Sequence, residues 1–372
     1  MKKCIAILFF LLFITASPLM ASNNSNIIID GTTIAATSHG EMLPLRDVAE
    51  HLRWTLSWNN STRAATIRRG NRTITITIDS RNATVNGSAV TLAAPPTIID
   101  GRTMVTLCFF ADHMGLGAGH INNAFILSTR PATSIPVLIY HHIIPDAVNT
   151  RFTNNAWTIS TENFTQQMRH LRDNGFYTPT LDEFEAFLFN GRPLPQRSVM
   201  IHFDDGYYSN IVYAYPILQE FGLRAVLFPI TERGQVYGDT QPLNDHNGLT
   251  WAAVGTLMSL FESGVWETAS HSHDMHQHAP CGVATVLAVS SHDEILYDTL
   301  LSFEFVTNTR AYAYPLGQYN STVIGALREA GITMGFTTEH RRITQRSDPF
   351  RLGRFTIYRE TTMARFRDIV GG

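Results

Sequence analysis

The sequence of 372 residues contains almost no lysine. Its only lysines are Lys2 and Lys3, so every later permanently cationic side chain is an arginine. This excludes Schiff-base chemistry, lysine-dependent phosphate loops and Ser-Lys hydrolases from the rest of the chain, because each of them needs a lysine amine. The formal net charge is −3 and the sequence has no basic cluster, so its charge does not indicate nucleic-acid binding. The length suffices for two or three domains with hydrophobic cores.

Cysteine is scarce as well. Cys4 lies in the apolar N-terminal stretch, which leaves only Cys108 and Cys281 in the remainder of the chain. Two cysteines so far apart do not make a disulfide framework, so we expect neither to be structural or catalytic.

Residues 1–21 have the pattern of a secretory signal. Lys2 and Lys3 form the charged start, residues 5–14 the apolar stretch, and residues 19–21 a small-residue cleavage point. An uncleaved membrane anchor is the alternative, although the apolar stretch is short for a full span. In either case we expect the rest of the protein to be secreted or associated with the cell envelope.

Residues 22–130 are expected to form a small α+β domain. Residues 73–78 alternate with period two, as a half-buried strand does, and Asn86-Gly87 between two short apolar runs is a strong hairpin signal. The chain also contains an internal repeat: residues 98–101 resemble residues 28–31, and residues 104–114 resemble residues 42–52. The repeat predicts two copies of one small unit that pack together.

This arrangement resembles the copper amine oxidase N-terminal-like domain found in exported bacterial proteins. The resemblance implies a stalk or envelope-binding module, and despite the family name it does not imply bound copper. His51 and His113 fall at matching positions of the two expected helices. We interpret them as surface or half-buried histidines.

Strands and helices alternate in residues 131–372, beyond a linker-like stretch at 129–134. Ser160 can cap one helix, and Thr180 begins a capping-box pattern at the start of the next. Strands are expected at 135–140, 198–203 and 224–228, directly before His271, and at 311–314. Repeated βα units of this length predict a parallel sheet closed into a barrel or nearly so.

Candidate chemical groups follow these strands. Asp204 and Asp205 end one apolar run, while His271 and His276 follow another. Asp205 with the two histidines would give a three-ligand metal site with a position left open for water. Asp204, which is not needed as a ligand, could act as general base on that water.

Two further strand ends add to this set. His141 follows the first strand directly and could supply the proton that a leaving group needs. Residues 315–317, Pro-Leu-Gly, form a tight turn whose backbone amide could face a developing oxyanion. Taken singly, each feature has an ordinary structural interpretation. Four such features at four strand ends favour a hydrolytic site.

With these motifs, residues 135–360 resemble the polysaccharide deacetylases, the NodB-homology group known as carbohydrate esterase family 4. The first family motif, Thr-Phe-Asp-Asp-Gly, stands here as His202-Phe203-Asp204-Asp205-Gly206. The second corresponds to His271-Ser272 and His276, and the third to Arg310 with Pro315-Leu316-Gly317. The stretch 136–143 is similar to the branch of biofilm poly-N-acetylglucosamine deacetylases, in which a catalytic histidine comes from this early strand.

The resemblance implies a distorted (β/α) barrel of the NodB type, a divalent metal, usually zinc, and removal of acetyl groups from N-acetylated sugars. It assigns Asp204 as the base and His141 as the acid. It further assigns the Leu316 amide as the oxyanion donor, and the metal ligands as Asp205, His271 and His276. The implied partner is a polysaccharide, with poly-N-acetylglucosamine, peptidoglycan and chitin-like polymers left open. The N-terminal domain would attach the enzyme to the cell envelope.

The chain departs from the family pattern in places. His202 replaces the usual Thr and could add a competing imidazole near the metal. The ligand histidines are one residue further apart than in the commonest pattern, so His273 and His278 stay open as alternatives. Arg351 and Arg354 could orient Asp204, but we favour surface ion pairs for both. An O-acetyl glycan esterase and a catalytically inactive glycan-binding protein stay open as alternative functions.

Overall fold

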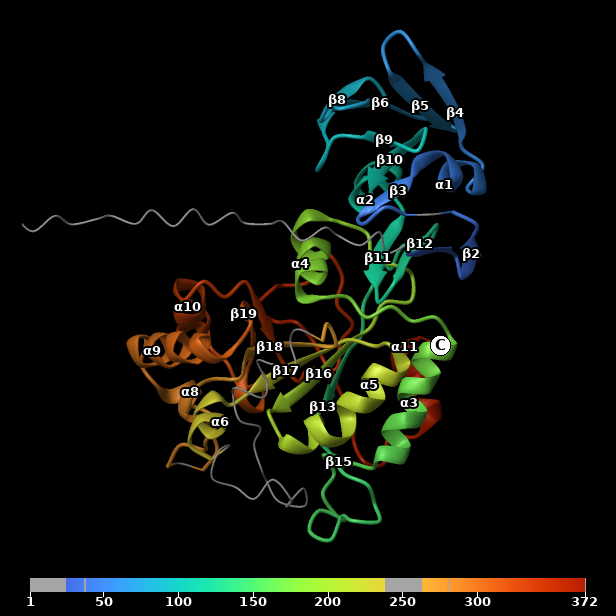
Figure 1. The fold of residues 1–372 in the computed structure, drawn as a ribbon. Coiled ribbons are helices and arrows are strands. Elements are labelled where there is room, and N and C mark those ends of the chain that lie inside the picture. The colour runs from blue at the N-terminus through green and yellow to red at the C-terminus, as the bar shows by residue number, and fades with distance from the viewer. Residues whose placement is uncertain (1–24, 37, 238–262, 281, 372) are drawn as a thin grey trace, which may run out of the picture.

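The computed structural model describes residues 25–36, 38–237, 263–280 and 282–371 (Figure 1). The expected signal at residues 1–21, Cys4 and Cys281, and a helix expected from about Thr250, lie outside the described residues. Within the described part of the chain, none of the helices has the length and apolar character needed to cross a membrane.

Three small sheets and two helices make up the N-terminal body. One sheet has the order β11-β12-β1-β2, with β1 (Asn26–Ile29), β2 (Thr32–Ile34), β11 (Gly117–Ile121) and β12 (Ala124–Ser128). A second has the order β3-β10-β9, with β3 (Met42–Pro44), β9 (Thr97–Ile99) and β10 (Arg102–Thr106). The third is an antiparallel meander of β4 (Thr55–Asn59), β5 (Ala64–Arg69), β6 (Arg72–Thr77), β7 (Asn82–Val85) and β8 (Ser88–Thr91). The helices are α1 (Leu45–His51) and α2 (Leu107–Met114).

The internal repeat is confirmed. Strands β3 and β10 pair antiparallel, and each runs directly into its helix, α1 or α2. The hairpin signal is also correct, because Asn86 and Gly87 both have positive φ between β7 and β8. His51 is exposed and His113 is half-buried, as expected. Cys108 is a half-buried free thiol.

The C-terminal body is built on one parallel sheet. Its order is β20-β19-β18-β17-β16-β13-β21, with β13 (Val137–Tyr140), β16 (Met200–Asp205), β17 (Ala225–Pro229), β18 (Trp266–Ser270), β19 (Asn308–Ala313), β20 (Met334–Phe336) and β21 (Phe355–Thr356). A separate short pair joins β14 (His142–Ile143) to β15 (Thr158–Ile159). The helical segments are α3 (Thr161–Asp173), α4 (Leu181–Asn190), η1 (Asn210–Ala214), α5 (Tyr215–Phe221), α6 (Thr231–Tyr237), α8 (Val286–Val289), α9 (His292–Ser302), η2 (Phe303–Phe305), η3 (Pro315–Gly317), α10 (Ser321–Glu329) and α11 (Met363–Val370).

The helix starts agree with the sequence signals. The Ser160 side chain accepts the Asn163 N–H at the start of α3. Thr180 and Glu183 form a complete capping box at the start of α4. Both caps satisfy backbone N–H groups that a helix leaves without an intrahelical partner.

The parallel sheet curls into a half-barrel, so the predicted fold class is confirmed. The sheet stays open between β20 and β21, but Leu352 partly bridges this gap. Its N–H donates to the Gly335 carbonyl at 2.9 Å, and its carbonyl accepts the Thr337 N–H at 2.8 Å. The strand order therefore places the C-terminal ends of all seven strands around one mouth.

Residue alternation along β16 separates two cores. Ile201 and Phe203 pack outward against α3 and α5, in a cluster that includes Phe164 and Leu218. Met200 faces the barrel interior with the side chains of the neighbouring strands. Because strand side chains alternate, Asp204 shares this inward face and arrives inside the barrel at the end of the strand.

The two bodies meet at the N-terminal ends of the barrel strands, away from the mouth (Figure 1). The carbonyl of His120 on β11 accepts a hydrogen bond from the Arg224 guanidinium at 2.6 Å. The Tyr177 hydroxyl lies 2.6 Å from the Glu183 carboxylate and accepts the His120 N–H at 3.1 Å. One hydrophobic cluster contains only residues from 27 to 127. This separate core supports our proposal that the domains are residues 22–130 and 131–372.

We expect Gly119→Ala to destabilise the protein. A Cβ at this position on β11 would lie 2.3 Å from the Tyr177 ring. That ring is buried and held by Glu183, so it cannot move aside freely. Overpacking of this kind costs about 1–3 kcal/mol. The matched control is Gly325→Ala in α10, where the nearest atom would be 3.7 Å away. Thermal unfolding measures both variants, and equal midpoints for the two would contradict the packing argument.

Candidate metal and catalytic site

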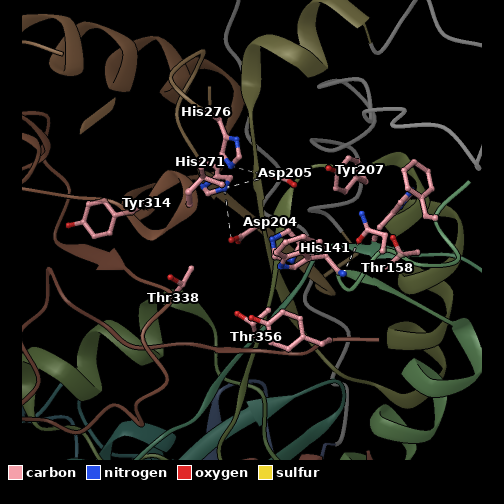
Figure 2. Close-up of a pocket in the computed structure, with 16 residues that line it drawn as sticks. His141, Thr158, Asp204, Asp205, Tyr207, His271, His276, Tyr314, Thr338 and Thr356 are labelled. Atoms are coloured by element: carbon pink, nitrogen blue, oxygen red, sulfur yellow. Dashed lines mark hydrogen bonds and ion pairs between the residues drawn. The ribbon is translucent and has the colours of Figure 1, made fainter. Parts of the chain in front are cut away.

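A cavity of about 400 Å³ opens at the C-terminal ends of the barrel strands (Figure 2). The six residues predicted to form the site all line it: His141, Asp204, Asp205, His271, His276 and Leu316. They come from the ends of β13, β16, β18 and β19 and from the segments that follow these strands. The parallel sheet therefore brings together side chains that are up to 175 positions apart in the sequence.

Asp205, His271 and His276 have the arrangement of a metal-binding triad. Their ligand atoms all lie within 4.8 Å of one another. Asp205 Oδ1 is 3.6 Å from Nε2 of His271 and 3.4 Å from Nε2 of His276. This oxygen is buried and has no hydrogen-bond donor among the described residues. A buried carboxylate oxygen facing two imidazole nitrogens fits a divalent cation of the zinc type.

His271 is oriented for this role by a backbone contact. Its Nδ1 lies 2.8 Å from the carbonyl oxygen of Ala313 on β19. Because a carbonyl can only accept, Nδ1 carries the proton and Nε2 presents its lone pair to the cavity. Burial lowers the pKa of His271 to about 4, so the ring is neutral near pH 7 and able to bind a metal.

The loop between the two histidines is held by Asp298 of α9. One carboxylate oxygen accepts the His273 N–H at 2.8 Å, and the other accepts the Asp274 N–H at 2.7 Å. Ser272 adopts φ 74°, which turns the chain sharply after His271. The clamp and the turn together return His276 to the same side as His271.

The Asp-Asp-Gly sequence allows both carboxylates to face the cavity. Consecutive strand residues normally point to opposite faces, but Asp205 has φ 73° and so leaves the regular pleat. Gly206 has φ 80°, and a Cβ there would lie 2.8 Å from Pro229. The next residue, Tyr207, hydrogen-bonds the Asp205 carboxylate, and burial together with that carboxylate raises the pKa of the Tyr207 hydroxyl well above its usual value.

Asp204 is paired with Arg354, which corrects our interpretation of this arginine as a surface residue. Arg354 is fully buried, and its two terminal nitrogens contact the two Asp204 oxygens at 2.7 and 2.8 Å. Burial would raise the pKa of Asp204, but the guanidinium outweighs it, with help from His271 and His141, and holds the pKa well below its usual value. Sequence spacing did not reveal the pair, because the partners are 150 positions apart. Arg351 lies on the surface beside Asp348, as expected.

His141 and Leu316 flank the carboxylates. Nδ1 of His141 is buried and has no partner among the described residues. Leu316 has φ 53°, and the described residues provide no acceptor for its backbone N–H. The Leu316 N–H is therefore a donor that a molecule in the cavity can use, and the His141 ring lines the same cavity.

Three other candidates lie outside the triad. His202 is fully buried between the rings of Phe228 and Phe336, at centroid distances of 4.9 and 4.8 Å. His273 instead pairs its Nδ1 with the Thr231 hydroxyl at 2.9 Å. His278 is exposed. The arginine of the third motif, Arg310, is also remote from the site, because it forms ion pairs with Asp182 and Glu185 of α4.

The structure adds cavity residues that sequence reasoning missed. Tyr207 follows Asp-Asp-Gly directly, so its adjacency to the motif could have identified it. Trp157 and Tyr358 lie in irregular segments far apart in the sequence, and no local pattern marks them. Sequence reasoning also missed Asp298, which lies in α9 outside the cavity and holds the His271–His276 loop through two backbone N–H groups.

Comparison with known proteins gives matches for both bodies. A protein-family model described as polysaccharide deacetylase matches residues 191–335, and one described as copper amine oxidase N-terminal domain matches residues 22–123. The chain is 30% identical over 205 residues to the poly-β-1,6-N-acetyl-D-glucosamine N-deacetylase of Staphylococcus epidermidis, covering 54% of this chain and 68% of that protein. Both resemblances drawn from the motifs are therefore confirmed.

Solved structures share the fold. A de-N-acetylase from Aggregatibacter actinomycetemcomitans superposes with a TM-score of 0.54 at 22% identity, covering 63% of this chain and 99% of that chain. A polysaccharide deacetylase from Bacillus cereus gives a TM-score of 0.52 at 18% identity, covering 85% of this chain and 99% of that one. At these identities the likeness concerns the fold alone.

We expect Arg354→Gln to destabilise the protein strongly near neutral pH. The substitution leaves the buried Asp204 carboxylate without its countercharge, and breaking a buried pair costs about 3–5 kcal/mol. In the parent, the folded-state pKa of Asp204 lies below the unfolded value, so the pair adds stability above about pH 4 that is lost as the pH falls. The difference in thermal midpoint between variant and parent should therefore persist from pH 7 down to about pH 4 and shrink only as the pH falls further. Arg351→Gln, on the surface, is the control. If both variants lowered the thermal midpoint by a similar small amount, the result would contradict the stabilising role of the buried ion pair.

Metal binding provides a second test of the site. Calorimetric titration of the chelator-treated protein with Zn²⁺ should show one tight site. His276→Ala should weaken it by at least about tenfold, because it removes one of three ligands. His278→Ala, on the same loop but exposed, should bind like the parent. If the His278 variant lost affinity and the His276 variant kept it, the ligand assignment would be wrong.

Proposed function

The chain belongs to the polysaccharide deacetylase family, and from this premise we propose that it hydrolyses N-acetyl groups of a polysaccharide containing N-acetylglucosamine, giving glucosamine units and acetate. The observation that carries this proposal is a buried carboxylate, Asp204, held ionised beside the Asp205, His271 and His276 triad. The Staphylococcus epidermidis relative is named for poly-β-1,6-N-acetyl-D-glucosamine, which makes that polymer our first candidate substrate.

Asp205, His271 and His276 would hold the cation, for which we propose zinc. When bound there, a zinc ion supplies Lewis-acid polarisation of the acetyl oxygen and of the attacking water. The triad has three protein ligands, the number typical of catalytic zinc sites that keep a position for water or substrate.

Asp204 is the proposed general base. Its carboxylate is deprotonated at neutral pH because Arg354 stabilises the charge. The two bonds from Arg354 fix the orientation of the carboxylate, and each oxygen retains a lone pair for a further contact. Asp204 Oδ2 lies 3.9 Å from Nε2 of His271, so the base is adjacent to the triad. It can therefore accept a proton from a water molecule held between them.

His141 and Leu316 complete the proposed chemistry. His141 lines the cavity, and its ring can give a proton to the departing amine. The Leu316 N–H can donate to the oxygen of the acetyl group as negative charge develops on it. Both groups act on the same amide. Attack by water forms the new C–O bond and places negative charge on the carbonyl oxygen, and the C–N bond then breaks as the nitrogen takes up the proton.

We further propose that residues 1–21 direct export and that the N-terminal domain attaches the enzyme to the cell envelope. Support comes from the charged and apolar pattern of the first residues and from the family match at 22–123. The junction at the N-terminal ends of the barrel strands leaves the mouth facing away from this domain (Figure 1). A tethered enzyme could therefore present its site to a polymer.

Acetate release tests the proposed function. The purified protein should release acetate from N-acetylglucosamine oligomers or from peptidoglycan when zinc is present, and a chelator should abolish the release. Asp204→Asn should lower turnover by about 10²–10⁴-fold, the range for loss of a general base. His141→Ala should bind metal normally but turn over slowly.

Asp348→Asn is the matched control, because this exposed carboxylate does not line the cavity and contacts the surface arginine Arg351 and the Phe350 backbone N–H. It should behave like the parent. O-acetylated xylan serves as the ester substrate. Faster release from the ester than from every amide would move the assignment to a glycan esterase. Near-native activity in Asp204→Asn would overturn the proposed mechanism.

A further inference from the structure

Two exposed aromatic rings stand at one side of the catalytic cavity. Trp157 is 49% exposed and Tyr358 is 39% exposed, and both line the cavity. Their ring centroids are 6.4 Å apart, and the Trp157 ring is 6.5 Å from that of His141. We call the pair the aromatic wall. Large apolar rings exposed this close to a reactive site indicate a binding surface.

The aromatic wall is held in place by Arg359. The backbone N–H of Arg359 donates to the Ala156 carbonyl at 2.7 Å, which joins the two segments beside Trp157 and Tyr358. Its guanidinium donates to the Asp146 carboxylate at 2.6 Å and to the Thr158 carbonyl at 3.4 Å. The two rings are therefore positioned before any ligand arrives, which reduces the entropy lost on binding.

A second hollow continues beyond the wall. Its volume is about 840 Å³, and it shares Asn155 and Tyr358 with the catalytic cavity. Its other lining residues are mostly polar, including Asn154, Asn163 and Thr361. The Asn163 side chain has no hydrogen-bond partner recorded among the described residues. The hollow thus adjoins the catalytic cavity at Asn155 and Tyr358, and we call the two together the groove.

The charges in the hollow are nearly balanced. Arg359 is paired with Asp146, and Arg365 is paired with Asp368. Glu360 adds one exposed carboxylate. A groove without a surplus of positive charge favours neutral sugar units over an anionic polymer.

We propose that the aromatic wall and the hollow behind it bind sugar units adjacent to the one being deacetylated. A pyranose ring presents a face of C–H groups and an edge of hydroxyl groups. The C–H face packs on an aromatic ring, and the hydroxyl groups bond to amide side chains such as those of Asn155 and Asn163. The ligand class is a neutral oligomer of linked N-acetylglucosamine units. This inference rests on the proposed function, because the same groove leads to the catalytic residues.

Binding of oligomers to the chelator-treated full-length protein tests the groove separately from catalysis. Calorimetry with the N-acetylglucosamine hexamer should give a dissociation constant that rises about tenfold or more in Trp157→Ala and in Tyr358→Ala, the loss expected for a central aromatic contact. Trp157→Phe, which keeps a ring, should retain most of the affinity. Trp58→Ala, at an exposed tryptophan of the N-terminal domain, should bind like the parent.

Turnover with oligomers of increasing length gives the second measurement. The parent should show kcat/KM rising from the dimer to the hexamer, and the two wall variants should lose this rise while their thermal midpoints stay unchanged. Equal hexamer affinity in the parent and both wall variants would overturn the inference, as would absence of hexamer binding by the parent. Tight, wall-dependent binding without acetate release would leave the inference standing and overturn the proposed function.

Discussion

The buried ion pair between Arg354 and Asp204 is the interaction on which the rest of the structure depends. Two charged groups inside a barrel are tolerated only because each satisfies the other and the remaining donors find acceptors. Arg354 Nε donates to the Thr337 carbonyl, and the Arg354 N–H donates to the Glu339 carbonyl. The guanidinium thus ties β16 to the segments that follow β20 and precede β21. The Arg354 guanidinium therefore stabilises the barrel at the gap between β20 and β21, where the sheet stays open.

The same pair sets the electrostatics of the cavity. An ionised Asp204 stands beside Asp205, and two adjacent carboxylates repel each other unless cationic groups lie close by. Arg354 compensates one of them, while the two histidines of the triad face the other. The site therefore has one carboxylate whose charge is satisfied within the protein and one whose free oxygen is available to a cation. This division fits the proposed roles of the two consecutive residues, Asp204 as base and Asp205 as metal ligand.

Three residues at the mouth of the barrel share a backbone conformation that is rare for residues other than glycine. Asp205, Ser272 and Leu316 each have positive φ, at 73°, 74° and 53°. Such conformations are disfavoured for residues with a side chain and persist where the surrounding structure imposes them. Each of the three lies at the end of a different barrel strand, at the point where the chain turns to point a functional group inward. The buried strands offset this cost, since each turn closely follows a strand that is held in the barrel sheet.

The local sequence determined most of the secondary structure and the identity of the motif residues. Strand and helix periodicity, the caps at Ser160 and Thr180, and the repeated N-terminal unit were all readable, because each depends on neighbours within a few residues. The motif residues of the cavity were readable too, because parallel strands gather their C-terminal ends at one mouth. Only the tertiary structure decided that Arg354, and neither Arg310 nor a surface partner, pairs with Asp204. It also decided that His202 points into the aromatic core and that Trp157 meets Tyr358. Those contacts join residues 134 to 201 positions apart, and no local sequence pattern encodes which distant side chains the curled sheet brings together.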